Sequence, residues 1–180
     1  MAILDGGADT CVIGKGWTVL AEHPTRRANV VGFDKDIAIK GNLAIVSAIC
    51  AIQLPEGDPI YLVIHEAIYN PTADHSLLSD FQLREYGTQI DAVATRHGGK
   101  QQMQLRDGTI VPLTLKGCMV HFQHRSLTET EVSNIDLETL PDSAHHLTQQ
   151  DAPWTPHSHN DDPHESVSYT HLTLPTILLV

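Results

Sequence analysis

Short apolar and β-branched runs, separated by turn-forming residues, extend along residues 1–122 and favour a protein built from strands. Residues 43–54 form one such run and residues 59–68 form another, which alternates. Between them, Pro55-Glu-Gly-Asp58 has the composition of a turn. The two runs therefore predict a β-hairpin.

Two further hairpins are predicted from their turns. Asp107-Gly108, between the runs 101–106 and 109–115, is the pair favoured in a type I′ turn. Residues 27–40 contain another hairpin, with its turn at residues 33–36. We expect this last hairpin to be exposed, and it is the candidate for a flap.

One helix is indicated by its capping residues. Ser79 followed by Gln82 has the spacing of a capping box, and Gly87 occupies the position just past the helix end. Many short strands, many turns and one short helix predict a mainly β fold for residues 1–124.

The pattern changes after residue 124, where the chain becomes polar and acidic. All eleven Lys and Arg lie at or before Arg125, whereas residues 127–166 hold nine of the 22 acids and no base. Such a segment buries too little apolar surface to offset its ordering entropy, so residues 125–166 are predicted to be a largely disordered linker, with one short helix within residues 128–140. Its negative charge argues against direct binding to nucleic acid.

The last residues have a different origin. Residues 167–176, Val-Ser-Tyr-Thr-His-Leu-Thr-Leu-Pro-Thr, match the translation of a sequencing-library adapter in one reading frame. We therefore predict that residues 167–180 are a translated adapter and not part of the fold, and we exclude them as an expression scar would be.

Cysteine and hydropathy patterns narrow the class of protein. Cys11, Cys50 and Cys118 are widely spaced and odd in number, which predicts buried thiols in a reducing compartment and no disulfide framework. No apolar run is long enough to span a membrane, and no basic flank of a signal peptide is present. These features predict a cytoplasmic protein without membrane contact.

Residues 3–13, Ile-Leu-Asp-Gly-Gly-Ala-Asp-Thr-Cys-Val-Ile, carry the candidate chemistry. Asp5 follows apolar residues and begins a glycine turn, where positive φ and close backbone approach are expected. Two carboxylates that share one proton can activate water for peptide hydrolysis. Only one such loop is present, so the second aspartate must come from an identical partner in a two-fold dimer. The alternative is that Asp5-Gly6-Gly7 is simply a turn.

The loop resembles that of retropepsin-like aspartic proteases at seven of eight positions. A second segment, Asp74-His-Ser-Leu-Leu-Ser-Asp-Phe-Gln-Leu-Arg-Glu-Tyr-Gly87, resembles the strand, turn and helix that close that fold behind the active site. Its form is most similar to the gag-pol polyproteins of copia-type retrotransposons, and the resemblance covers roughly residues 2–155. It implies a retropepsin-like barrel that is half of a homodimer, and an endopeptidase that cuts its own polyprotein in the cytoplasm or in virus-like particles.

The resemblance also implies roles for single residues. Asp5 would be the catalytic aspartate, and Gly6, Gly7 and Ala8 would shape its loop. Asp9 and Thr10 would bind substrate backbone or support the dimer, with Arg84 as the ion-pair partner of Asp9. No metal or organic cofactor is required by this chemistry.

Two departures from the family support an alternative, a catalytically inactive relic: a β-domain derived from such a protease that acts only as a binding or structural segment. Gly6 stands where the family carries Ser or Thr, whose hydroxyl hydrogen-bonds across the dimer axis. The family also places a strand before the loop, and we expect that strand to be missing here, with Met1 a start inside a longer polyprotein. A third reading is a small acidic β-barrel binding module.

Histidines cluster in the acidic segment, at residues 145–146, 157, 159 and 164, and we interpret them as solvated, not as metal ligands. His121 and His124, near the end of a predicted strand, are expected at the surface.

Overall fold

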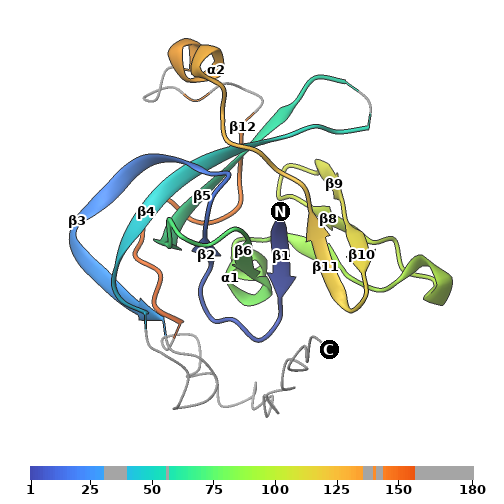
Figure 1. Ribbon diagram of the computed structural model, residues 1–180. Coiled ribbons are helices and arrows are strands. Elements are labelled where there is room, and N and C mark those ends of the chain that lie inside the picture. Colours follow the sequence, from blue (N-terminus) through green and yellow to red (C-terminus); the bar gives the residue numbers. More distant parts are fainter. Residues whose placement is uncertain (31–39, 56, 136–139, 141–143, 157–180) are drawn as a thin grey trace.

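The computed structural model describes residues 1–30, 40–55, 57–135, 140 and 144–156. The fold is mainly β, with a large sheet in the order β10-β11-β1-β6-β2-β5-β4-β3, an added strand β12 beside β5, and a small sheet β7-β8-β9 (Figure 1). The strands are β1 (Ala2–Asp5), β2 (Val12–Ile13), β3 (Thr18–Val30), β4 (Lys40–Ile52), β5 (Ile60–Tyr69), β6 (Ser76–Ser79), β7 (Gln89–Asp91), β8 (Gln102–Gln104), β9 (Ile110–Pro112), β10 (Thr114–Lys116), β11 (Met119–Phe122) and β12 (Ala144–His146). The helices are α1 (Asp80–Glu85), a 3₁₀ turn η1 (Thr95–His97) and α2 (Glu129–Asn134).

The predicted hairpin between residues 43–54 and 59–68 is confirmed as β4 and β5, which pair antiparallel. Both strands are long and apolar, and their buried side chains, Ile49, Cys50, Leu62 and Ile64 among them, form the centre of the core. Strand β3 pairs with the other edge of β4 out to Val30 and Lys40. The predicted flap tip lies outside the described residues.

Strand β6 lies between β1 and β2, although β1 and β2 follow one another in the sequence. It pairs parallel with β1, where Asp5 is level with Ser79, and antiparallel with β2, where Val12 faces Leu77. The other edge of β1 pairs antiparallel with β11, where Ala2 faces Phe122. The segment between β1 and β2 must therefore pass around the end of β6, and it begins directly after Asp5.

The hairpin at Asp107-Gly108 is confirmed as β8 and β9, but the predicted turn type is wrong. A type I′ turn needs positive φ at both central residues, and here Gly108 has φ 91° while Asp107 does not have a positive φ. The amide of Gly108 donates to the carbonyl of Leu105, and that of Leu105 donates to Thr109. The loop is thus a turn followed by a left-handed glycine.

The predicted helix is confirmed as α1. Ser79 is its N-cap and accepts from the Gln82 amide at 3.1 Å, and Gly87 follows the C-cap with φ 97°. The side chain of Gln82, however, does not complete a capping box, because it bonds to Cys11. Helix α2 lies within the predicted range of residues 128–140 and has a full capping box between Thr128 and Glu131.

The prediction that residues 125–166 are largely disordered is wrong for residues 144–156. Strand β12 pairs parallel with β5, and the Leu147 amide donates to the Val63 carbonyl at 2.8 Å. Leu147 and Thr148 are fully or almost fully buried. Backbone hydrogen bonds, the buried Leu147 and side-chain contacts of His146, Thr148 and Trp154 order a segment that has little apolar surface of its own.

Two histidines predicted at the surface are less exposed than expected, because His121 is buried and His124 is half-buried. His121 is 4% exposed on β11, and His124 donates from its ring to the Gly16 carbonyl at 3.0 Å while it packs against Trp17. Burial lowers the pKa of His124, which favours the neutral ring. Within the described residues, no helix has the length and apolar character needed to cross a membrane.

We predict that Leu147→Ala lowers the free energy of unfolding by about 2–4 kcal/mol, because it opens a cavity under β12. Urea denaturation measures this change. Val132→Ala on the exposed face of α2 is the control and should change stability by less than about 0.5 kcal/mol. Equal stability of the two variants would contradict the packing of residues 144–156 on the core.

Candidate active site

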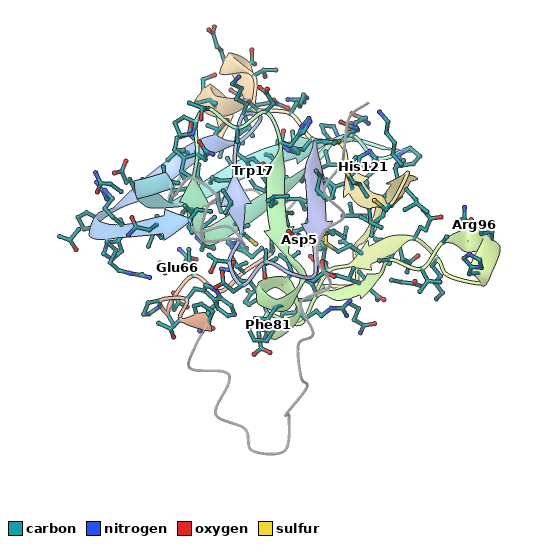
Figure 2. All side chains as sticks on the ribbon, turned by 60° about the horizontal axis from the view of Figure 1, so that its bottom comes forward. Asp5, Trp17, Glu66, Phe81, Arg96 and His121 are labelled. Carbon is teal, nitrogen blue, oxygen red and sulfur yellow. The ribbon has the colours of Figure 1, made fainter. Side chains whose placement is uncertain are left out.

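Asp5 is the last residue of β1, at the point where the strand turns into the loop (Figure 2). Its carboxylate oxygen Oδ1 accepts the Gly7 amide at 2.9 Å, and its carbonyl accepts the Ala8 amide at 3.4 Å. Asp5 itself is half-buried, whereas Gly6 and Gly7 are exposed. The carboxylate is thus fixed by its own loop and still open to solvent.

The two loop glycines do not have the positive φ expected from the sequence. At Gly7 a Cβ would lie 3.4 Å from Asp5 Oδ1, which is an ordinary van der Waals distance. At Gly6 a Cβ would meet no heavy atom within 4 Å. A side chain at position 6 would therefore fit within this chain.

The loop is held from behind by Ser79. Its hydroxyl donates to the Ala8 carbonyl at 2.7 Å, and its amide contacts Cys11 Sγ at 3.2 Å. The Cys11 amide in turn donates to the side-chain oxygen of Gln82 at 2.8 Å. Because Ser79, Cys11 and Gln82 are all buried, these hydrogen bonds lock the loop to the start of α1.

The thiols differ from one another in environment. Burial raises the pKa of Cys11 to about 12 and that of Cys50 well above its usual value, so both remain protonated. Cys118 is exposed, and the expectation that all three thiols are buried is wrong for it.

Asp80 is a residue that the sequence interpretation missed. It follows Ser79, which is level with Asp5 on the neighbouring strand. Burial raises the pKa of its carboxyl; Arg84 opposes this shift, and the charge of Asp5 adds to it. Asp80 is therefore the acidic neighbour of Asp5 within one chain, and only its position beside an N-cap serine could have indicated it.

Asp9, Thr10 and Arg84 are not brought together as predicted. Arg84 Nη2 donates to the Ile90 carbonyl at 2.9 Å and lies 3.9 Å from an oxygen of Asp80. Within the described residues, Asp9 and Arg84 form no ion pair. The loop residues Asp9 and Thr10 instead contact Trp154, whose indole nitrogen donates to the Asp9 carbonyl at 3.0 Å.

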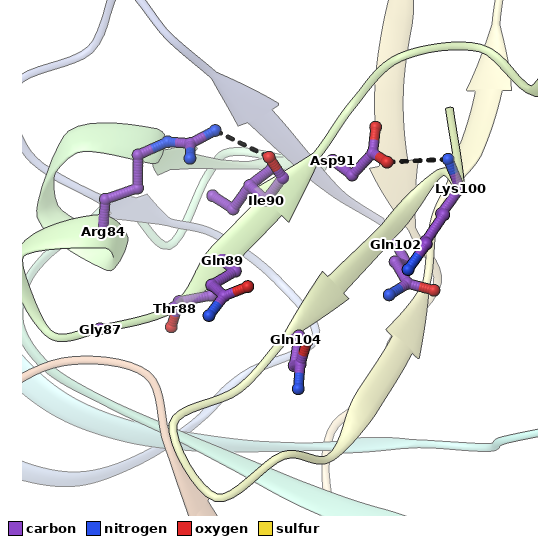
Figure 3. A pocket seen from close by; sticks show the side chains of 9 residues that line it. All are labelled: Arg84, Gly87, Thr88, Gln89, Ile90, Asp91, Lys100, Gln102 and Gln104. Carbon is purple, nitrogen blue, oxygen red and sulfur yellow. Dashed lines mark hydrogen bonds between the residues drawn. The ribbon is translucent and has the colours of Figure 1, made fainter. Parts of the chain in front are cut away.

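A polar hollow of about 550 Å³ lies apart from Asp5, between α1 and the small sheet (Figure 3). Arg84, Lys100 and the glutamines Gln89, Gln102 and Gln104 line it. One wall is held by a hydrogen bond from the Lys100 amide to Asp91 at 2.9 Å. The hollow contains Arg84 and no residue of the Asp5 loop.

A chain of polar side chains anchors the acidic segment to the sheet. Ser47 Oγ lies 2.8 Å from His65 Nδ1, and His65 Nε2 lies 3.0 Å from His146 Nδ1 on β12. The two rings stack with centroids 5.2 Å apart. Burial lowers the pKa of His65 to about 4, with a further contribution from His146. Neutral rings satisfy both contacts when Ser47 and His65 each donate.

Within the part of the chain that the structure describes, no group of three or more His, Cys, Asp or Glu side chains is placed to hold a metal ion. Comparison with family models, curated proteins and solved structures finds no match to this chain.

We predict that Ser79→Ala destabilises the protein by about 2 kcal/mol, because it removes both the N-cap of α1 and the bond to Ala8. Thr128→Ala, at the N-cap of α2, removes only a surface cap and should cost about 1 kcal/mol. Urea denaturation compares the two. An equal loss would show that the contact between Ser79 and Ala8 contributes nothing to stability.

A second prediction concerns the dependence of stability on pH. The folded-state pKa of His65 is lower than its unfolded value, so the unfolded chain binds more protons between pH 6.5 and about 4. Stability should therefore be greatest above pH 6.5 and fall as the pH decreases, with a contribution from His65 of up to about 3 kcal/mol. His65→Gln should flatten this part of the pH–stability curve measured by urea denaturation, and His97→Gln at the surface should not. A curve as steep in His65→Gln as in the wild type would contradict the assignment.

Proposed function

We propose that this chain is the aspartic endopeptidase domain of a copia-type retrotransposon polyprotein. The observation that carries the proposal is the insertion of β6 between β1 and β2. It joins the two segments that bear the resemblance, with Asp5 level with Ser79 although 74 positions separate them. Helix α1 then packs behind the Asp5 loop through Ser79 and Gln82. This is the relation between the two segments that a retropepsin-like half-barrel requires.

The proposed reaction is hydrolysis of a peptide bond by water held between two Asp5 residues of a homodimer. Like charges at short distance cannot both ionise, so the pair shares one proton. One carboxylate accepts a proton from the water while the other donates a hydrogen bond to the scissile carbonyl. In each chain Oδ1 of Asp5 accepts the Gly7 amide, which favours one fixed orientation of the carboxylate.

Other loop residues have supporting roles in the proposal. Asp9 is exposed, so its carboxylate is available to the backbone of a polypeptide substrate. The natural substrate would be the polyprotein itself, and the chemistry uses no cofactor.

The resemblance implies a strand that precedes the loop and pairs with β1, on the edge opposite β6. In this chain β11 pairs with that edge through Ala2 and Ile3. The strand that bears Asp5 is therefore hydrogen-bonded on both sides, by β6 and by β11. The loop can be formed without a further strand at that position.

An inactive protease relic is the second candidate, and Gly6 favours it. Without a hydroxyl at position 6, the two loops of a dimer lose the hydrogen bonds that the family uses to align them. A misplacement of about 1 Å can cost roughly 100-fold in rate. The space around Gly6 leaves room for the missing side chain, so the two candidates can be separated by restoring it.

We predict that the full chain cleaves polyprotein-derived peptides at mildly acid pH, that pepstatin inhibits it, and that Asp5→Asn reduces cleavage to background. Gly6→Thr should raise the cleavage rate about tenfold or more and strengthen dimerisation, because the hydroxyl realigns the two loops. Peptide cleavage and analytical ultracentrifugation measure the two effects. Cleavage by none of the three proteins, with all of them folded, would reject the enzyme and favour the relic.

A further inference from the structure

Residues 144–154 form a strap that runs from the far end of β5 to the candidate catalytic loop. Strand β12 pairs with Tyr61, Leu62 and Val63 of β5. The Thr148 hydroxyl then accepts the His65 amide at 2.7 Å and donates to the His65 carbonyl at 2.8 Å. The Thr148 side chain thus extends the pairing between β12 and β5 by two further hydrogen bonds.

Glu66 lies in an irregular part of β5, beside His65, to which the strap bonds. Between the pairs Val46–Ala67 and Ala48–Ile64, β5 contains one residue more than β4, which is a β-bulge. Glu66 adopts φ 55° in this bulge, a conformation that is costly for a residue with a side chain and that recurs at functional sites.

The carboxylate of Glu66 contacts two distant segments. It accepts Arg26 at 2.6 Å from β3 and the Trp154 amide at 3.0 Å from the strap. Its carbonyl accepts the side-chain amide of Gln82 at 3.4 Å. Glu66 therefore joins the strap to the same hydrogen-bond network that supports the loop from behind.

Trp154 contacts the loop directly. Its indole Nε1 donates to the Asp9 carbonyl at 3.0 Å and lies 3.2 Å from the Thr10 hydroxyl. The ring packs edge-on against Phe81 of α1, with centroids 5.6 Å apart. Figure 2 shows Phe81 and Glu66 near the loop that begins at Asp5. The part of the loop that contains Asp9 and Thr10 is thus hydrogen-bonded by Trp154, which lies 144 positions after Thr10.

We propose that Trp154 is a positioning residue for the catalytic loop: through Asp9 and Thr10 it fixes the half of the loop that Ser79 does not reach. The inference rests on the proposed function for its catalytic part. The need for such a residue is greater here than in a loop with a hydroxyl at position 6, because Gly6 adds backbone freedom. Ser79 restrains Ala8, Gln82 restrains Cys11, and Trp154 restrains the two residues between them.

The test uses two variants of the full chain. Trp154→Phe keeps a ring against Phe81 and removes the N–H, and Trp154→Ala removes both. Hydrogen exchange of residues 5–12, measured by mass spectrometry, should be about three- to tenfold faster in Trp154→Phe, because one hydrogen bond is lost. Trp154→Ala should exchange at least as fast. The β8–β9 hairpin, which belongs to the other sheet, is the internal control and should not change.

Two exchange results would overturn the proposal. One is an unchanged rate in residues 5–12 of both variants. The other is an equal acceleration in the loop and in the β8–β9 hairpin, which would mean that Trp154 supports the whole fold and not the loop.

Kinetics separate this inference from the proposed function. If the wild type cleaves peptides, Trp154→Phe should lower kcat, because displacement of the loop misaligns Asp5, and it should also raise KM, because Asp9 of the same loop is proposed to bind the substrate backbone. A selective rise in KM would contradict a positioning role. If neither the wild type nor Gly6→Thr cleaves, the proposed function fails; faster exchange of the loop in Trp154→Phe would still support positioning by Trp154, and unchanged exchange would overturn it.

Discussion

The insertion of β6 between two strands that are consecutive in the sequence is the constraint on which the site depends. The segment after β2 lies against the segment before β6, and the approach is close: a Cβ on Gly14 would lie 2.4 Å from the Ala73 carbonyl oxygen. Ser76 links the two segments, because its hydroxyl accepts both the Gly14 amide and the indole N–H of Trp17. With β6 fixed in this way, the loop that contains Asp5 has no other path than around its end.

Buried polar side chains hold the loop in place through hydrogen bonds, as apolar side chains hold the core together by packing. The hydrogen bonds of Ser79, Gln82 and Cys11 are short and hidden from water, so the loss of one partner would leave another polar atom unsatisfied. Such contacts define one geometry more sharply than apolar packing does. The candidate catalytic loop is therefore supported by groups from two distant regions of the chain, residues 79–82 and Trp154.

The sequence predicted what is encoded locally. The strands around residues 55–58 and 107–108 and the cap at Ser79 follow from turn and capping chemistry within a few residues. Long-range partners had no such signal. Gln82 was interpreted as a capping residue because its spacing fits, and it bonds to Cys11 because the loop passes over it. Trp154 lies in a polar, acidic segment, so neither its pairing with the loop nor that of β12 with β5 could be inferred from composition.

The pairing of β1 with β11 has a consequence for synthesis. The strand that ends at Asp5 is made well before its partners β6 and β11, which end at Ser79 and Phe122. Contacts this distant in sequence are slow to form, and domains fold as their parts leave the ribosome. During synthesis the Asp5 loop would stay unformed until β11, which ends at Phe122, had emerged. The strand that bears Asp5 is thus made before the strands that hold it and is among the last parts of this fold to reach its final structure, so any activity that depends on the loop begins only late in synthesis.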